Sequence, residues 1–356
     1  MSRKLICAVV LLALLAAPLQ ANDPALESLA RDGHWKRLRA AVEPRLKANP
    51  NDAEANYYMA AVREAFNDLA GALPLAEKAL QLDAKNSDYH YMVGAIQGQM
   101  AEKAGVFKAM GLVGRFKKEV QAAIDLDPNN IEALFAQMEF YLQAPGIVGG
   151  DKKKARANAD RIFAINPSRG NLAYARVVLK ENPRADVANY FVNAVQADPR
   201  SYGARVQLAN FYASDRQKKY DLSEQEAREA LKANPGRVGA YSLLAALFAL
   251  QERWSDLDAI LVQSEKNVPD NLYPYYQAGR VLLGSGKDLP RAERYLRKYL
   301  TQEPEAGAPS HAATHWRLGL VYEKMGRKAE AIAEIQTAVR LDPKFEPAQK
   351  DLKRLK

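Results

Sequence analysis

The chain has 356 residues, a formal net charge of +9, four histidines and a single cysteine, Cys7. One cysteine cannot form an intramolecular disulfide or a thiolate-rich metal site, which excludes the disulfide-stabilised and zinc-finger classes. The modest positive charge is typical of a solvated helical surface, although it would also suit an acidic partner.

The N-terminus predicts export. Ser2-Arg3-Lys4 precede an apolar run from Leu5 to Ala17, which is followed by Pro18 and the small residue Ala21. This order is typical of a cleavable secretory signal peptide over 1–21, and the run is too short for a membrane span. We therefore expect a periplasmic protein with no nucleic-acid partner, and retention of the segment as an uncleaved anchor is the alternative.

Beyond residue 22, helical stretches end at regular intervals of about 34 residues. The closing positions, of which one is not a proline, are Pro50, Ala84, Pro128, Pro167, Pro199, Pro235, Pro269, Pro304 and Pro343. Two-helix units of this length bury their apolar faces only against their neighbours. The period predicts an all-α fold, an α-solenoid of about nine helix-turn-helix repeats over 22–343. The polar tail over 344–356 predicts a capping helix.

The last unit carries the fullest pattern of residue types. Counted from Ala312 as position 1, positions 7, 8, 11, 15, 20, 27 and 32 hold Leu318, Gly319, Tyr322, Gly326, Ala331, Ala338 and Pro343. This pattern resembles the tetratricopeptide repeat family. The resemblance implies a right-handed superhelix in which small residues allow close helix approach, and a scaffold that binds other proteins.

Two insertions interrupt the repeat spacing, near 101–118 and 144–154. In the first, Val106, Met110 and Val113 recur at helical spacing among basic residues, which predicts a projecting basic hairpin. Such a hairpin could dock a partner helix or an anionic membrane face, or simply pack on itself. The second insertion contains a Pro-Gly and Gly-Gly-Asp pattern similar to a loop in periplasmic repeat subunits associated with TRAP-type solute transporters.

The tetratricopeptide resemblance implies that the first helix of each unit lines a concave groove. Five of the eight residues at position 5 of units two to nine are aromatic. Aromatic side chains provide large contact area at low entropic cost, so the groove residues are candidate partner contacts. The alternative is that the rings pack between neighbouring helices. The candidate partner contacts are these five aromatic residues and three further residues on first helices, Tyr273 and Arg280 in unit eight and Arg176 in unit five. The full set is Tyr57, Tyr91, Phe135, Arg176, Tyr273, Tyr276, Arg280 and Trp316.

Charge is unevenly distributed along the expected groove. Acidic residues concentrate in units two to four and basic residues in unit five. Because charge mainly sets register and association rate, this distribution predicts that the groove orients a bound segment of opposite pattern.

No catalytic motif emerges from the sequence. His311 and His315 share a helix face but have no third ligand nearby, and no carboxylate pair or phosphate loop is recognisable. We expect neither an enzyme nor a cofactor or metal site. The leading hypothesis is a periplasmic scaffold that binds a segment of another envelope protein, in cell-envelope assembly. The alternative is a solute- or glycan-handling binding module, and self-association would hide the aromatic groove.

Overall fold

The computed structural model describes residues 23–356, so the predicted signal peptide over 1–21 lies outside the described residues. Within them the regular elements are nineteen α-helices and one short 3-10 helix, with no strand. This confirms the predicted all-α fold class.

The helices follow one another with short connections. Their bounds are α1 (Pro24–Asp32), α2 (Trp35–Ala48), α3 (Ala53–Ala65), α4 (Leu69–Leu82), α5 (Ser87–Glu102), α6 (Val106–Leu126), α7 (Ile131–Gln143), η1 (Gly146–Val148), α8 (Lys152–Ile165), α9 (Pro167–Glu181), α10 (Ala188–Ala197), α11 (Tyr202–Ala213), α12 (Tyr220–Ala233), α13 (Val238–Leu250), α14 (Trp254–Asn267), α15 (Tyr273–Ser285), α16 (Leu289–Tyr299), α17 (His311–Lys324), α18 (Lys328–Leu341) and α19 (Glu346–Leu355).

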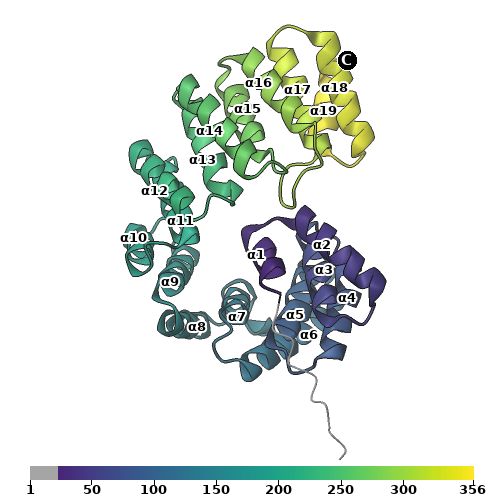
Figure 1. Ribbon diagram of the computed structural model, residues 1–356, viewed down its shortest axis with the longest axis vertical. Helices are drawn as coiled ribbons and strands as arrows, with labels where there is room; N and C mark the ends of the chain where they lie inside the picture. The colour runs from purple at the N-terminus through teal and green to yellow at the C-terminus, as the bar shows by residue number, and fades with distance from the viewer. Residues whose placement is uncertain (1–22) are drawn as a thin grey trace, which may run out of the picture.

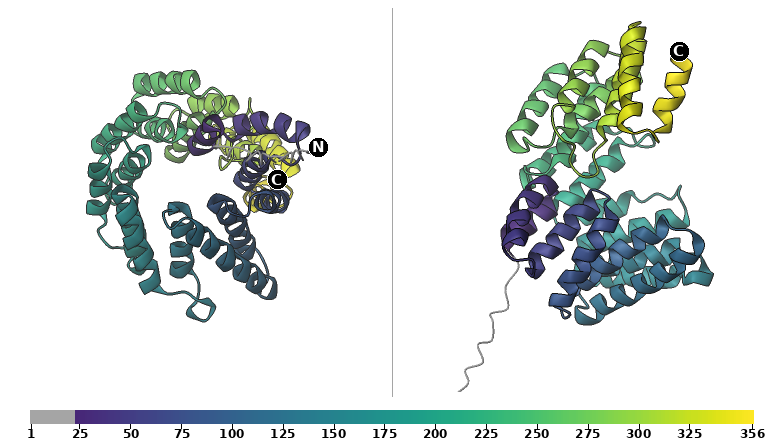
Figure 2. Two further views of the ribbon diagram at one scale, coloured as in Figure 1. Left: turned by 60° about the horizontal axis from the view of Figure 1, so that its bottom comes forward. Right: turned by 90° about the vertical axis from the view of Figure 1, so that its right-hand side faces the viewer.

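Each odd-numbered helix from α1 to α17 pairs with the helix that follows it, which gives nine hairpins, and α19 packs on the last of them. The hairpins succeed one another around an arc, with the odd-numbered helices on its inner side (Figure 1). The views in Figure 2 show the same arc, with the first hairpin returning beside the last ones. The prediction of an α-solenoid of nine repeats is confirmed.

The boundary between repeats has a local cause. Asp127 precedes Pro128 and has φ −134° and ψ 97°, an extended conformation that the residue before a proline favours and that ends α6. Two residues after the proline, Asn130 caps α7, and its side-chain oxygen accepts the backbone N–H of Ala133 at 2.9 Å. The same short sequence thus stops one helix and starts the next.

Within a repeat, small residues allow the two helices to approach. A Cβ atom placed on Gly319 of α17 would lie 2.5 Å from the Cγ1 atom of Ile335 on α18. At the corresponding place in the preceding repeat, a Cβ on Gly279 would lie 2.9 Å from the Cγ atom of Leu296. Both contacts are too short for a real side chain, so glycine is required for this helix spacing.

The apolar core is divided along the chain. One continuous cluster of buried side chains runs from α11 to α19, over residues 202–355. Three smaller clusters serve the rest: one spans α6 to α9, one spans α3 to α5, and one spans α1 to α3. The stack is therefore more continuous in its C-terminal half.

A polar contact joins the two ends of the arc, where α2 meets the loops that precede α15 and α17 (Figure 1). The Lys36 ammonium donates to the carbonyl oxygen of Glu303 at 2.7 Å, and Arg37 Nε donates to Asp270 Oδ2 at 2.9 Å. Arg39 pairs with the Glu303 carboxylate at 2.9 Å. We call these five residues the closing contact. The partners lie more than 200 positions apart in sequence, and repeat spacing gave no indication of them.

The first insertion is a lengthened helix pair. The hairpin of α5 and α6 has helices of 16 and 21 residues, and the segment 101–118 covers the end of α5, a short turn and the first part of α6. No helix in the part of the chain that the structure describes has both the length and the apolar character needed to span a membrane.

Candidate partner-binding site

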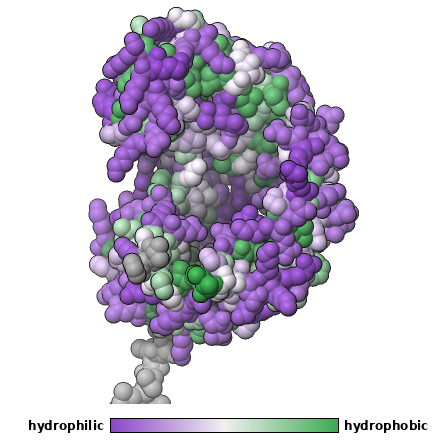
Figure 3. All heavy atoms as spheres, turned by 180° about the vertical axis from the view of Figure 1, so that it is seen from behind, coloured by the Kyte–Doolittle hydropathy of each residue, from purple (hydrophilic) through white to green (hydrophobic). Residues whose placement is uncertain are grey.

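The inner face of the arc surrounds a hollow that opens through the middle of the molecule (Figure 3). Three of the predicted aromatic residues lie on consecutive odd-numbered helices in the N-terminal part of the arc. Tyr57 on α3, Tyr91 on α5 and Phe135 on α7 are all half-buried. The Tyr57 ring lies with its centroid 5.1 Å from that of Tyr89, and the Arg169 guanidinium lies 5.0 Å from the centroid of Phe135. Burial raises the pKa of the Tyr91 hydroxyl well above its usual value.

The C-terminal aromatic residues differ in their burial. Tyr276 is only 4% exposed, its ring lies 5.2 Å from that of Tyr299, and its hydroxyl accepts a hydrogen bond from Arg317. The half-buried Tyr273 stacks on it with centroids 6.1 Å apart. Tyr276 thus leaves almost no ring surface for a partner, which favours the alternative that at this repeat the ring packs between neighbouring helices.

Trp316 has a comparable structural role at the end of the stack. Its indole N–H donates to Asp351 of α19 at 2.8 Å, and its ring meets the Phe345 ring edge-on at 5.6 Å. The half-buried indole therefore holds α19 against the last repeat.

The charged groups of neighbouring repeats neutralise one another. Arg176 on α9 pairs with Glu139 on α7 at 2.6 Å, and Arg169 pairs with Glu132 at 2.8 Å. Partial burial would raise the pKa of Glu139, but hydrogen bonds from Arg176 and Gln143 hold it below its usual range. The predicted acidic and basic parts of the groove are thus joined by ion pairs where they meet, and whether they orient a bound segment stays a prediction.

Arg280, the remaining charged candidate, lies on α15. It is exposed, and its Nε atom donates to the side-chain oxygen of Gln277 at 2.8 Å. The structure thus pairs Arg176 with Glu139, one turn from Phe135 on α7, whereas Arg280 lies on α15 with Tyr273 and Tyr276 in a separate part of the arc.

The two histidines of α17 have separate partners. His315 Nδ1 lies 2.6 Å from Glu334, and His311 Nε2 lies 2.8 Å from the carbonyl oxygen of Gln302. Among residues 23–356 there is no cluster of three or more histidine, cysteine or acidic side chains arranged to hold a metal ion.

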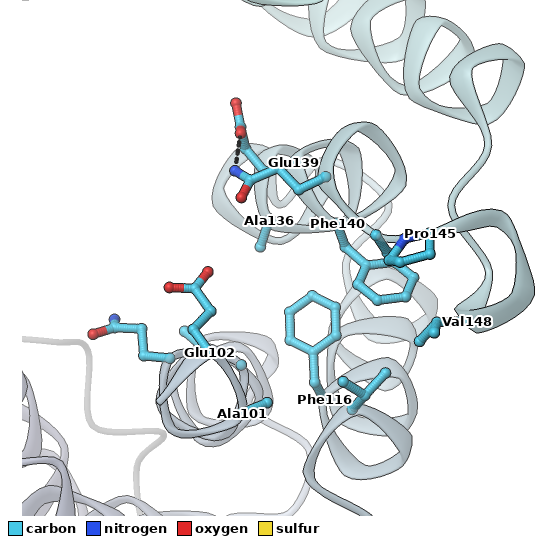
Figure 4. Close-up of a pocket in the computed structure, with 14 residues that line it drawn as sticks. Ala101, Glu102, Phe116, Ala136, Glu139, Phe140, Pro145 and Val148 are labelled. Carbon is cyan, nitrogen blue, oxygen red and sulfur yellow. Dashed lines mark hydrogen bonds between the residues drawn. The ribbon is translucent and has the colours of Figure 1, made fainter. Parts of the chain in front are cut away.

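Sequence reasoning missed a cavity of about 440 Å³ between α5, α6 and α7. Both inserted segments contribute to its wall, through Val113 and Phe116 on one side and Pro145 and Val148 on the other (Figure 4). The available signal was the run of small residues that face each other across it, Ala95 and Gly98 on α5 and Ala136 on α7. Small residues are expected between packed helices, so they did not suggest a cavity.

Comparison with known proteins supports the repeat assignment. Residues 276–344 match the family model described as tetratricopeptide repeat. No curated protein matches the chain.

Three solved structures are similar in fold. Yeast Tom70 is 14% identical over 93% of this chain and 80% of its own, with a TM-score of 0.49. A tetratricopeptide repeat protein from Parabacteroides merdae is 16% identical over 85% of this chain and 98% of its own, with a TM-score of 0.42. A thermophilic tetratricopeptide repeat protein from Thermus thermophilus is 16% identical over 54% of this chain and 97% of its own, with a TM-score of 0.46. Residues 276–344 are thus similar to the tetratricopeptide repeat, and the nine stacked hairpins have the architecture of such repeats, which are typically non-catalytic scaffolds for protein–protein interaction.

Proposed function

We propose that this protein is an exported, periplasmic scaffold that holds a segment of another cell-envelope protein on the inner face of repeats two to four, in cell-envelope assembly. The observation that carries the proposal is the row of half-buried rings of Tyr57, Tyr91 and Phe135 on three consecutive inner helices. The signal-like sequence over 1–21 supports export.

Half-buried rings suit this role for a physical reason. A ring fixed by its neighbours loses little conformational entropy when a partner covers its remaining surface, and aromatic side chains dominate binding energy at interfaces. The Arg169 guanidinium beside Phe135 adds a donor that can reach a carbonyl or carboxylate of the bound segment.

The alternative of a solute- or glycan-handling module is less well supported. The loop similar to that of transporter-associated subunits contributes Pro145 and Val148 to the cavity, but that cavity is largely apolar and has Glu102 and Glu139 at its mouth. A sugar would lack hydrogen-bond partners against the apolar wall, and an acidic solute would be repelled by the carboxylates.

Photo-crosslinking in cells tests the proposal. Probes at Tyr91 and Phe135 are compared with a probe at Lys232, whose side chain is 72% exposed on α12, outside the arc. We expect a discrete crosslinked envelope protein from the two inner probes alone. Equal or absent adducts at all three positions would contradict the scaffold proposal. Fractionation of the cells tests location separately, and a full-length unprocessed protein in the cytoplasm would contradict export.

Substitution then measures the contribution of each ring. Tyr91→Ala and Phe135→Ala should each weaken binding of the crosslinked partner by about 1–3 kcal/mol. Val262→Ala on α14, where the valine is 67% exposed, is the matched control and should leave the affinity unchanged.

A further inference from the structure

The two insertions that interrupt the repeat spacing meet at one cavity, which the regular repeats would not form. One face of α5 and one face of α7 supply most of its lining, at residues three and four positions apart on each helix. The extended N-terminal part of α6 closes its floor, and the segment after α7 closes one side (Figure 4). The cavity therefore depends on both insertions.

The floor is formed by two rings in tilted contact. Phe116 is 7% exposed, and its ring centroid lies 5.3 Å from that of Phe140. A Cβ on Gly98 would lie 3.0 Å from the Phe116 ring, so glycine at this position lets the ring sit against α5. Above the rings, the short side chains of Ala95 and Ala136 leave the space between the helices unfilled.

The mouth of the cavity has a different character. Figure 4 shows Glu102 and Glu139 on the side away from Phe116, Phe140 and Val148. Glu64 lies nearby, since its carboxylate accepts a hydrogen bond from Gln99 of the lining. Glu139 is neutralised by its pair with Arg176 and by the nearby Lys180, whereas Glu64 and Glu102 are in no ion pair among the described residues. The cavity thus combines an apolar floor with two carboxylates at its mouth that are free to pair with a cation.

Apolar surface continues outside the cavity along the same inserted segments. Ile147 in η1 is 98% exposed and Met110 in α6 is 66% exposed. These two side chains add exposed apolar surface on the same segments that line the cavity, where a bound partner could cover it.

We infer that this cavity receives an apolar side chain, of the size of leucine or phenylalanine, from a basic segment of the protein partner, with lysine or arginine flanking that residue at the mouth. The inference rests on the proposed function and names the chemistry of the bound segment. A volume of about 440 Å³ lies in the range of small-ligand and side-chain pockets. The carboxylates at the mouth complement a cationic segment and disfavour the anionic head group of a lipid.

Three labelled helical peptides test this chemistry against the full-length protein. The first carries leucine and phenylalanine on one face and lysine on the other, the second has glutamate for each lysine, and the third has serine for each apolar residue. We expect only the first to bind, by fluorescence anisotropy. General attraction to a protein of net charge +9 would favour the glutamate peptide instead, so binding of the first reports local complementarity.

Two variants locate the binding. Ala136→Phe fills the cavity and should weaken binding at least about tenfold. Ala329→Phe at an exposed position of α18 is its control. Glu102→Lys reverses an exposed charge at the mouth, without a core change, and should also weaken binding, unlike Glu181→Lys at the exposed end of α9.

The outcomes separate this inference from the proposed function. Unchanged affinity in both Ala136→Phe and Glu102→Lys, or absence of binding by the first peptide, would overturn the inference. So would a preference for the glutamate peptide or for phosphatidylglycerol vesicles, which would instead assign the basic residues of 101–118 to an anionic surface. A partner still captured through Tyr91 in those cases would leave the scaffold function standing.

Discussion

Repeats six to nine and repeats three to four are built from the same helical hairpin, but they differ in how much of their apolar surface is buried. In repeats six to nine the apolar side chains of α11 to α19 form one continuous cluster, and Tyr241, Phe248 and Tyr322 are almost fully covered. In repeats three and four the cluster is smaller, α6 is lengthened to 21 residues, and apolar surface remains open at the cavity and at Ile147. Where the repeat spacing is kept, apolar surface stabilises the stack; where insertions break it, apolar surface stays available to a partner.

The largest effect should come from opening the continuous core. Phe248 on α13 is 1% exposed, with the Arg253 guanidinium 4.5 Å from its ring centroid. Phe248→Ala removes a buried ring and should cost about 3–5 kcal/mol of the free energy of unfolding, measured by urea denaturation and circular dichroism. Met110→Ala in the insertion should change it by less than about 0.5 kcal/mol. Similar losses in both variants would remove the distinction between the two regions.

A second large effect should follow from removing the last helix. Truncation after Lys344 deletes the buried Ala348 and Leu355 and uncovers Trp316, so the C-terminal repeats should lose at least about 2 kcal/mol. Hydrogen exchange should accelerate first in α17 and α18 and leave α3 to α6 protected, since a solenoid repeat is stabilised mainly by its neighbours. Uniform acceleration along the chain would show that the two regions unfold together.

A smaller effect on the free energy of unfolding is expected at the closing contact. Breaking this contact tests whether stacking of repeats alone holds the two regions in place. The side chains of Arg37 and Asp270 are 39% and 24% exposed, so Arg37→Ala should cost only about 0.5–1 kcal/mol. Arg37→Ala should have a clearer effect on shape than on stability, namely a larger radius of gyration in small-angle scattering. High salt should produce the same increase in the wild type, because it screens the ion pairs. Lys232→Ala, which breaks a pair within α12, is the control and should leave the radius unchanged.

The smallest effect concerns Glu305, next to the closing contact. It is 5% exposed, its Oε1 accepts the backbone N–H of Lys36 at 3.2 Å, and its buried Oε2 has no hydrogen-bond partner among the described residues. Burial raises the pKa of this carboxyl, opposed by the N–H groups of Ala306 and Lys36. A raised pKa in the folded state means that ionised Glu305 destabilises the fold, so its contribution worsens as pH rises through that pKa.

Glu305→Gln should therefore melt at a slightly higher temperature than the wild type at pH 7. The difference should shrink as the pH falls into the range where the carboxyl binds a proton. Thermal melts of both proteins over that pH range measure this difference. A constant difference across the range would assign the effect to shape or hydrogen bonding rather than to charge.

The sequence predicts the fold because each boundary is local. Pro128 with Asn130 and Gly319 with Ile335 act within one repeat or between adjacent ones, so periodicity reveals them. The candidate site is predicted less completely. Tyr276 occupies the same repeat position as Tyr91, and its burial depends on Tyr299 and Arg317 from neighbouring helices. The cavity and the closing contact depend on how several repeats are placed in space, which a one-dimensional pattern does not contain.

The closing contact also limits how the arc can deform. Each repeat is positioned by the one before it, so a small rotation at one interface moves every later repeat, and the displacement grows with distance along the stack. Arg37 meets Asp270 only when the angles of all the intervening interfaces add to the required total. A bound segment that moved α5 away from α7 would therefore strain the closing contact, although that contact lies on the opposite side of the arc. The solenoid is therefore a closed arc rather than an open one, and a change in the angle at any repeat interface strains the closing contact.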